Sequence, residues 1–200
     1  MDYNQRRREQ GAQTEQHILQ AALELMRERG FDGVSVRDIC QKAGITTGAF
    51  YHHFPSKEAL LAKGFTPLDH YIRMALEGHQ TESPLVRLGR ILTAYATFME
   101  EESGELTGRY YQRRLSAPET RSIDTGRYIN EAMVTCFTDA KARGMLTAQH
   151  SPAWIASFCY RHFRGVVIDW VLCDYGYPLR EKMMEDYRLF ATLFSAQPGQ

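Results

Sequence analysis

Apolar residues recur three and four positions apart along most of the chain, which is the spacing of one face of an α-helix. The first such stretch begins at Thr14 and ends before Gly30, a residue type that commonly terminates helices. Its apolar stripe consists of Ile18, Ala21, Ala22, Leu25 and Met26. The pattern predicts an amphipathic helix with one buried face.

Two short helices are predicted directly after this one. Ser35 stands three positions before Asp38, which is a variant of the capping box that opens a helix, and Gly44 closes that helix. Thr46 is a suitable N-cap for the next helix, which reaches Phe54 before a proline interrupts it. A helix, a tight turn and a second short helix therefore follow one another closely.

The rest of the chain is also predicted to be helical. A fourth helix should run from Lys57 to about Leu76, with a kink or a restart where Pro67 removes a backbone donor. Two Ser-Pro pairs, which begin at Ser83 and Ser151, have the order of an N-cap followed by the first residue of a helix. The sequence thus predicts an all-α fold of about nine helices, with a mobile basic arm over residues 1–12, a first domain over 13–58 and a second domain over 59–200.

The composition is that of an ordinary globular protein, with 200 residues of which 44% are hydrophobic and 24% are charged. The 24 basic and 24 acidic side chains cancel, so the charge of the whole protein does not point to nucleic acid. Any basic surface must be local, as in the cluster Arg6, Arg7 and Arg8. No apolar run approaches the length of a membrane span, and no apolar stretch follows the arginines. We therefore expect no membrane segment, no secretory signal and a cytoplasmic location.

The sequence contains no recognisable catalytic or metal-binding pattern. The four cysteines lie far apart without a C-x-x-C spacing, which argues against a zinc site and against a disulfide framework. Cys159 and His162 stand three positions apart but lack further ligands and an orienting carboxylate. We expect no metal, no cofactor and no catalytic residue, so an all-α enzyme is the most distant alternative.

Residues 35–54 have the arrangement of a helix-turn-helix, in which the second helix enters the major groove of DNA. A helical hairpin in an ordinary bundle has the same spacing, so composition must discriminate between the two. If Phe50 and Phe54 face inward, the second helix presents hydroxyl, aromatic and imidazole groups outward instead of solubilising Glu and Lys. These outward residues are Thr47, Gly48, Tyr51, His52 and His53, and they favour DNA binding.

The segment from Thr14 to Phe65 resembles the N-terminal domain of the TetR family of bacterial transcriptional regulators. The family's spacing is matched by Gly30-Phe31, Ala43-Gly44-Ile45, Phe50-Tyr51-His52-His53-Phe54 and Ser56-Lys57. The resemblance implies that residues 13–58 are a helix-turn-helix DNA-binding domain and that 59–200 bind a ligand and dimerise. The implied function is a homodimeric repressor that leaves a palindromic operator in double-stranded DNA when a small-molecule effector binds.

The resemblance also implies roles for individual residues. Tyr51 and Lys57 match positions that hold DNA phosphates, and Arg37 matches a position that reaches a base edge in some members. Thr47 stands where Lys, Arg, Pro or Gln is frequent, so one phosphate contact is expected to be missing. The predicted DNA-binding residues are Arg37, Thr46, Thr47, Gly48, Tyr51, His52, His53 and Lys57.

In the second domain the resemblance implies a small-molecule cavity among the middle helices. Aromatic and sulfur-containing side chains are frequent there, and they suit an apolar or planar effector. The predicted lining residues are Tyr95, Phe98, Met99, Arg109, Tyr110, Met133, Phe137, Phe158 and His162. A DNA-binding dimer that responds to no effector is the main alternative.

The last two predicted helices are apolar on more than one face. Burial within the same chain would explain this surplus, whereas the resemblance implies a four-helix interface between two copies of the chain. The predicted interface residues are Trp154, Gly165, Val166, Trp170, Met183, Tyr187, Phe190 and Phe194.

Overall fold

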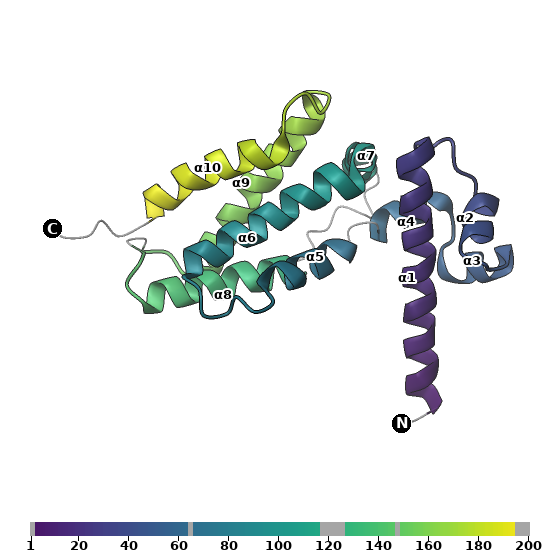
Figure 1. Ribbon diagram of the computed structural model, residues 1–200, viewed down its shortest axis with the longest axis horizontal. Coiled ribbons are helices and arrows are strands. Elements are labelled where there is room, and N and C mark those ends of the chain that lie inside the picture. Colours follow the sequence, from purple (N-terminus) through teal and green to yellow (C-terminus); the bar gives the residue numbers. More distant parts are fainter. Residues whose placement is uncertain (1–2, 64–65, 117–126, 147–148, 195–200) are drawn as a thin grey trace. The chain divides into compact units, whose positions relative to one another are not determined.

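The computed structural model describes residues 3–63, 66–116, 127–146 and 149–194, which contain ten α-helices, one π-helical segment and no β-strand (Figure 1). The predicted all-α fold is confirmed. The chain divides into two compact units. The first comprises Met1–Thr66 and Glu102–Gln112, and the second comprises Pro67–Glu101 and Arg113–Gln200.

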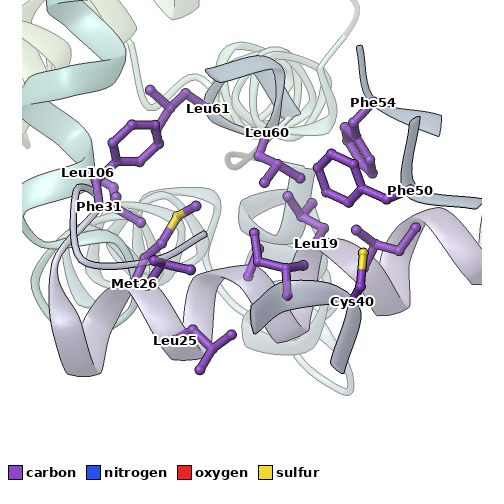
Figure 2. Packing of buried hydrophobic residues seen from close by; sticks show 14 residues of the cluster. Leu19, Leu25, Met26, Phe31, Cys40, Phe50, Phe54, Leu60, Leu61 and Leu106 are labelled. Atoms are coloured by element: carbon purple, nitrogen blue, oxygen red, sulfur yellow. The ribbon is translucent and has the colours of Figure 1, made fainter. Parts of the chain in front are cut away.

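The N-terminal part of the first unit consists of four helices, namely α1 (Tyr3–Arg29), α2 (Val36–Lys42), α3 (Thr47–His53) and α4 (Lys57–Lys63). Helix α1 packs against α2 and α4, and α2 packs against α3. Apolar side chains from all four helices meet in one buried cluster, which Figure 2 shows from close by. Ile18, Ile39 and Phe50 are fully buried in it and join α1, α2 and α3. The cluster therefore fixes the positions of the two short helices on α1.

Helix α1 begins at Tyr3, whereas the sequence pattern predicted a start at Thr14. Residues 3–12 are therefore helical, although their sequence pattern indicated no helix, and the mobile basic arm predicted over residues 1–12 stays a prediction; residues 1–2 lie outside the described residues. Gln, Arg and Glu are good helix formers, so a helix held by the buried residues from Ile18 onward can continue toward the N-terminus. The hydrophobic stripe therefore indicated only the part of α1 that packs against α2 and α4.

The first unit also extends beyond the predicted boundary at residue 58. Leu60 and Leu61 of α4 belong to its buried cluster, and Leu106 joins them from residues 102–112. A short three-helix domain buries little apolar surface by itself, and these side chains complete its core. Their membership depends on contacts between residues distant in sequence, which local periodicity does not report.

The remaining elements are α5 (Thr66–Leu76), α6 (Pro84–Thr97), the π-helical segment η1 (Phe98–Ser103), α7 (Glu105–Ser116), α8 (Tyr128–Ala142), α9 (Pro152–Leu172) and α10 (Leu179–Phe194). Most of α7 belongs to the first unit. In the second unit α6 packs against α8 and α10, and α9 packs against the same two helices (Figure 1). Among the described helices, none combines the length and the apolar character that crossing a bilayer requires.

The predicted fourth helix is in fact two helices, α4 and α5. Pro67 lies in the first turn of α5, where its missing N–H removes no helical hydrogen bond, so the helix restarts there. Residues 64–65 lie outside the described residues. The starts predicted from the two Ser-Pro pairs are confirmed, because α6 begins at Pro84 and α9 begins at Pro152.

Candidate nucleic-acid interface

The start of α2 is set by a reciprocal pair of hydrogen bonds. The backbone N–H of Ser35 donates to the Asp38 carboxylate at 2.8 Å, and the Asp38 N–H donates to Ser35 Oγ at 3.2 Å. The predicted capping box is therefore present. The hydroxyl and the backbone N–H of Ser35 both donate to the Asp38 carboxylate, and they lower its pKa.

The turn between α2 and α3 is equally local in origin. Gly44 has a φ of 63°, in the left-handed region that glycine adopts without a steric penalty. The Ile45 N–H donates to the carbonyl of Cys40 at 3.0 Å, which closes the end of α2. Thr46 Oγ1 then accepts from the Ala49 N–H at 3.1 Å and caps α3. Neighbouring residues alone thus define the geometry of the helix-turn-helix.

Helix α3 buries its two phenylalanines and exposes the face that was predicted to read DNA. Phe50 and Phe54 are fully buried, and their ring centroids lie 5.7 Å apart. The other predicted positions are at the surface: Thr47, Gly48, Tyr51 and His52 are exposed, and His53 is half-buried. The helix therefore has the orientation that the sequence pattern predicts.

The exposed face carries hydrogen-bond donors that suit DNA. Tyr51 is 55% exposed, and its ring lies edge-on to Phe50 with centroids 5.4 Å apart, so the buried ring supports a side chain whose hydroxyl can donate. Arg37 on α2 and Thr46 before α3 are also exposed. The Thr46 hydroxyl accepts one hydrogen bond as a cap and keeps its hydrogen for donation. Phosphates and base edges accept from such donors.

Lys57 has an internal role that the sequence did not indicate. Its Nζ donates to the backbone carbonyls of Phe31 at 2.7 Å and of Val34 at 2.8 Å. The same atom lies 4.3 Å from the centroid of the Phe31 ring. Two of its three N–H groups thus hold the loop between α1 and α2 onto the start of α4. Only the third remains for the predicted phosphate contact.

The nine residues predicted to line an effector cavity are divided between the two units, and those of the second unit line neither of the two cavities described next. Arg109 and Tyr110 belong to the first unit, where Arg109 pairs with Asp32 and lies 5.1 Å from the Phe31 ring centroid. Phe158 and His162 are exposed on α9, and His162 Nε2 lies 3.3 Å from the Asp186 carboxylate. The other five are buried in the second unit, as a packed core rather than the wall of either cavity described next; they are Tyr95, Phe98, Met99, Met133 and Phe137.

Among the cavities of the second unit are two, both lined partly by α6, whose lining residues were missed. The larger, about 620 Å³ and widely open, lies between α5, α6 and α10; its wall includes Tyr71, Val86, Arg90, Thr93, Thr97 and Met184. The smaller, about 270 Å³, lies between the end of α5, α6 and α8; its wall includes Leu76, Gln80, Arg87, Tyr128, Ala132 and Cys136. A stripe of small and polar residues on α6 at 86, 90, 93 and 97 was the available signal.

The residues predicted to form a dimer interface do not all lie on the surface of the protomer. Trp154 is 42% exposed, and Gly165 is exposed with open space where a side chain would lie. The Tyr187 hydroxyl donates to the Leu85 carbonyl within the same chain. Four others, Val166, Trp170, Met183 and Phe190, are buried inside the protomer, and the side chain of Phe194 lies outside the described residues.

The cysteines are free thiols, and three of the four are buried. Burial raises the pKa of Cys136 to about 11 and also raises the pKa of Cys159. Cys173 is exposed. Within the described residues, no cluster of three or more His, Cys, Asp or Glu side chains is arranged to hold a metal ion.

Comparison with known proteins agrees with this geometry. Residues 18–63, which include α2 and α3, match the model of the family described as bacterial regulatory proteins, tetR family. The chain is 25% identical over 162 residues to the HTH-type transcriptional repressor DhaR of Mycobacterium sp. (strain GP1), which covers 76% of this chain and 80% of that protein. It is 48% identical over 48 residues to the HTH-type transcriptional regulator UidR of Escherichia coli (strain K12), a match that spans only 24% of each protein.

Solved structures share the fold over nearly the whole chain. The TetR-family repressor FadR of Thermus thermophilus, solved in complex with lauroyl-CoA, has a TM-score of 0.68 at 21% identity and covers 93% of this chain and 98% of its own. The regulatory protein TetR from Rhodobacter sphaeroides has a TM-score of 0.62 at 24% identity, with 90% and 97% coverage. Residues 18–63, which contain the capped helix-turn-helix, therefore match the N-terminal domain of the TetR family, and together with the relatives and the shared fold they support a TetR family transcriptional regulator.

Proposed function

We propose that the protein is a homodimeric repressor that binds a palindromic operator and is released from it by a small apolar or aromatic effector. The observation that carries the proposal is the exposed face of α3, which presents Thr47, Tyr51 and His52 while Phe50 and Phe54 anchor the helix. A short helix so anchored can enter a major groove with its side chains toward the bases. A regulator acts on DNA, so the proposed location is the cytoplasm.

The donors around α3 divide into two proposed roles. Tyr51 and the remaining N–H of Lys57 bind phosphates, which positions the helix without reading sequence. Arg37 has the planar pair of donors that matches the two acceptors of guanine, and it reads a base edge. Thr46, Thr47, Gly48, His52 and His53 complete the surface that faces the groove.

The dimer proposal is supported by a stripe of exposed apolar side chains on α9. Trp154, Phe158 and Leu172 are 42%, 39% and 80% exposed, and Gly165 lies among them. Positions 158, 165 and 172 are seven residues apart, so they share one face of the helix. Gly165 would let a second helix approach closely. The interface then uses this outer face, while the buried residues Val166, Trp170, Met183 and Phe190 support it from within.

The effector proposal is supported by the two cavities beside α6 in the second unit. Their volumes fall within or near the range of small-molecule sites. Two proteins of the same fold were solved with acyl-CoA ligands, lauroyl-CoA in FadR of Thermus thermophilus and stearoyl-CoA in FadR of Bacillus subtilis. These neighbours support a ligand site in the helical unit and leave the ligand of this chain open.

The DNA part of the proposal can be tested by fluorescence anisotropy with the intergenic duplex beside the coding region and with a scrambled duplex. Arg37→Ala should weaken operator binding by about 1–3 kcal/mol and leave scrambled DNA nearly unaffected. Tyr51→Phe should weaken both duplexes alike, because a phosphate contact carries no sequence information. Arg188→Ala, an exposed arginine on α10, is the matched control and should change neither. Equal losses on both duplexes for Arg37→Ala would contradict its base-reading role.

A DNA-binding dimer without an effector remains the second candidate, because the five buried aromatic and methionine residues pack as core and not as a cavity wall. Thermal-shift screening separates the two proposals, since a ligand that binds only the folded state raises the melting temperature by mass action. An effector must also lower operator affinity, which requires unequal binding to the DNA-competent and released states.

A further inference from the structure

Helix α3 presents one exposed stripe, which is formed by Thr47, Gly48, Tyr51 and His52. Residues four positions apart lie above one another on a helix, so 47 and 51 share a face with 48 and 52. Phe50 and Phe54 occupy the opposite face and lie side by side in the buried cluster (Figure 2). The four exposed residues are therefore those that α3 can turn toward a base pair.

The stripe lacks every side chain that commonly identifies a base by charge or by paired hydrogen bonds. Arg and Lys pair with guanine, Asn and Gln pair with adenine, and Glu and Asp accept from cytosine. None of these residue types occurs in α3, whose sequence is TGAFYHH. Tyr51 is assigned above to a phosphate. Base contacts from this helix must therefore come from a methyl group, a hydroxyl or the imidazole of His52.

Thr47 carries the only methyl group of the stripe. The N-cap role belongs to its neighbour Thr46, whose Oγ1 accepts from the Ala49 N–H at 3.1 Å, so Thr47 is not needed to start the helix. Thr47 is exposed in the first turn of α3. The N-terminal residues of a recognition helix are those that reach base edges. The methyl group of Thr47 is thus available to DNA.

Gly48 has no side chain although the fold leaves room for one. Its backbone does not adopt the left-handed conformation that favours glycine, unlike that of Gly44. A Cβ added at Gly48 would meet only Thr46 Oγ1, at 3.8 Å, which is an ordinary van der Waals distance. Glycine also stabilises a helix less than alanine does. The protomer itself therefore does not require a glycine here, whereas a molecule that approaches α3 closely would.

Thymine is the base that fits these two neighbouring residues. Its C5-methyl group projects into the major groove, where it is contacted by apolar groups such as a threonine methyl. The bare surface over Gly48 lets the backbone of α3 approach the base pair, so the short side chain of Thr47 can reach it. Guanine, adenine and cytosine carry no methyl group and would leave that of Thr47 without this contact.

We propose that Thr47 and Gly48 set the sequence specificity of α3, and that they select A·T pairs through contact of the Thr47 methyl with the thymine C5-methyl. The proposal rests on the proposed function, because it names the base that the helix-turn-helix reads. Arg37 on α2 remains the reader of guanine. Each half-site thus combines a guanine with a thymine that faces α3.

The test removes the methyl group from the DNA and from the protein in turn. Fluorescence anisotropy compares the intergenic duplex with the same duplex made with deoxyuridine in place of thymidine, which lacks only the C5-methyl groups. Burial of one methyl group corresponds to about fourfold in affinity, so a dimer should bind the thymine duplex about fifteenfold more tightly. Thr47→Ser keeps the hydroxyl and should lose this preference. Thr47→Val keeps a methyl group and should retain it.

Gly48→Ala tests the close approach. Alanine favours the helix, so the melting temperature should not fall, while the added methyl group should hold α3 away from the base pair and abolish the preference for thymine. Tyr51→Phe is the control on the same stripe. It should weaken binding of both duplexes alike and keep the preference, because a phosphate contact does not depend on the base.

The reading of thymine is overturned if the unmodified protein binds the two duplexes equally. It is also overturned if the preference survives in Thr47→Ser or Gly48→Ala, since altered stiffness of the uracil duplex would then explain it, or if it disappears in Thr47→Val. These results leave the repressor proposal intact as long as the intergenic duplex is bound more tightly than the scrambled one. Equal binding of the intergenic and scrambled duplexes overturns the proposed function together with this inference.

Discussion

Replacing Lys57 with Met should destabilise the first unit, in addition to any effect on DNA. The ammonium group donates to the carbonyls of Phe31 and Val34 and lies 4.3 Å from the Phe31 ring centroid. Phe31 and Val34 are 7% and 1% exposed, so water replaces the lost donor only in part. A hydrogen bond from a charged group contributes about 1.5–3 kcal/mol, and partial hydration of the half-buried site reduces the sum of two such bonds to about 2–4 kcal/mol.

The assay must report on the first unit, which tryptophan fluorescence does not, because Trp154 and Trp170 both lie in the second unit. Native-state hydrogen exchange of the Ile39 and Phe50 amides follows opening of the buried cluster directly. The opening free energy at these amides should fall by about 2–4 kcal/mol in Lys57→Met, a large share of the 5–15 kcal/mol typical of a folded domain.

Lys42→Met is the matched control. Lys42 also lies in the first unit, but its Nζ pairs with the Glu24 carboxylate at 3.0 Å near the surface, so its loss should cost no more than about 1 kcal/mol. Exchange rates in Lys57→Met equal to those of the unmodified protein would refute the reasoning. If the slope of log affinity against log salt then fell by about 1.8, which is one phosphate contact per protomer of the dimer, Lys57 would be assigned to a DNA phosphate instead.

Three further predictions concern other parts of the chain. Gly165→Leu should raise the dimer dissociation constant in sedimentation equilibrium while leaving the protomer folded, since a side chain there meets open space within the protomer; a tighter dimer would contradict the proposed interface. The double change Arg6→Gln and Arg7→Gln should lower the salt slope of operator binding by up to about 3.6, because four exposed arginines are lost per dimer and each removes one possible phosphate contact. Helicity should hold because Gln is a good helix former. An unchanged slope would show that this part of α1 does not contact DNA. Iodoacetamide at pH 8 should label Cys173 in the folded protein, because this thiol is exposed. Cys136 and Cys159 should stay unlabelled, because burial shields both thiols and raises their pKa. Mass spectrometry that finds either of these two labelled would count against the packing.

The helix-turn-helix could be predicted from the sequence because every feature that builds it is local. The capping pair Ser35 and Asp38, the left-handed Gly44 and the cap of Thr46 act over three or four residues, and each has the predicted conformation. The orientation of α3 follows from the i, i+4 pair of phenylalanines. The exposed face was therefore predictable, although its contacts with DNA stay predictions.

Long-range contacts account for the differences from prediction. The family resemblance implied that Arg109 lines an effector cavity, yet it pairs with Asp32, 77 positions away, because residues 102–112 pack in the first unit. Lys57 was assigned to a phosphate, and its bonds to Phe31 and Val34 depend on the path of a loop more than twenty residues earlier. Neither contact leaves a periodic trace in the sequence.

Long-range contacts also decide which aromatic and methionine side chains of the second unit are buried in its core. Phe137, Met133 and Tyr95 are apolar or aromatic whether they pack as core or line a cavity, so composition does not separate the two outcomes. Arg87 and Arg90 look alike in sequence, and only the positions of Asp139 and Glu82 leave one guanidinium nitrogen unpaired and the other satisfied. The sequence by itself thus determined the helices, their caps and the presented face of α3, because these depend on backbone preferences and short-range periodicity. The tertiary structure alone decided the unit boundaries, the cavities and the partners of each charge, because these depend on which distant side chains fill the same space.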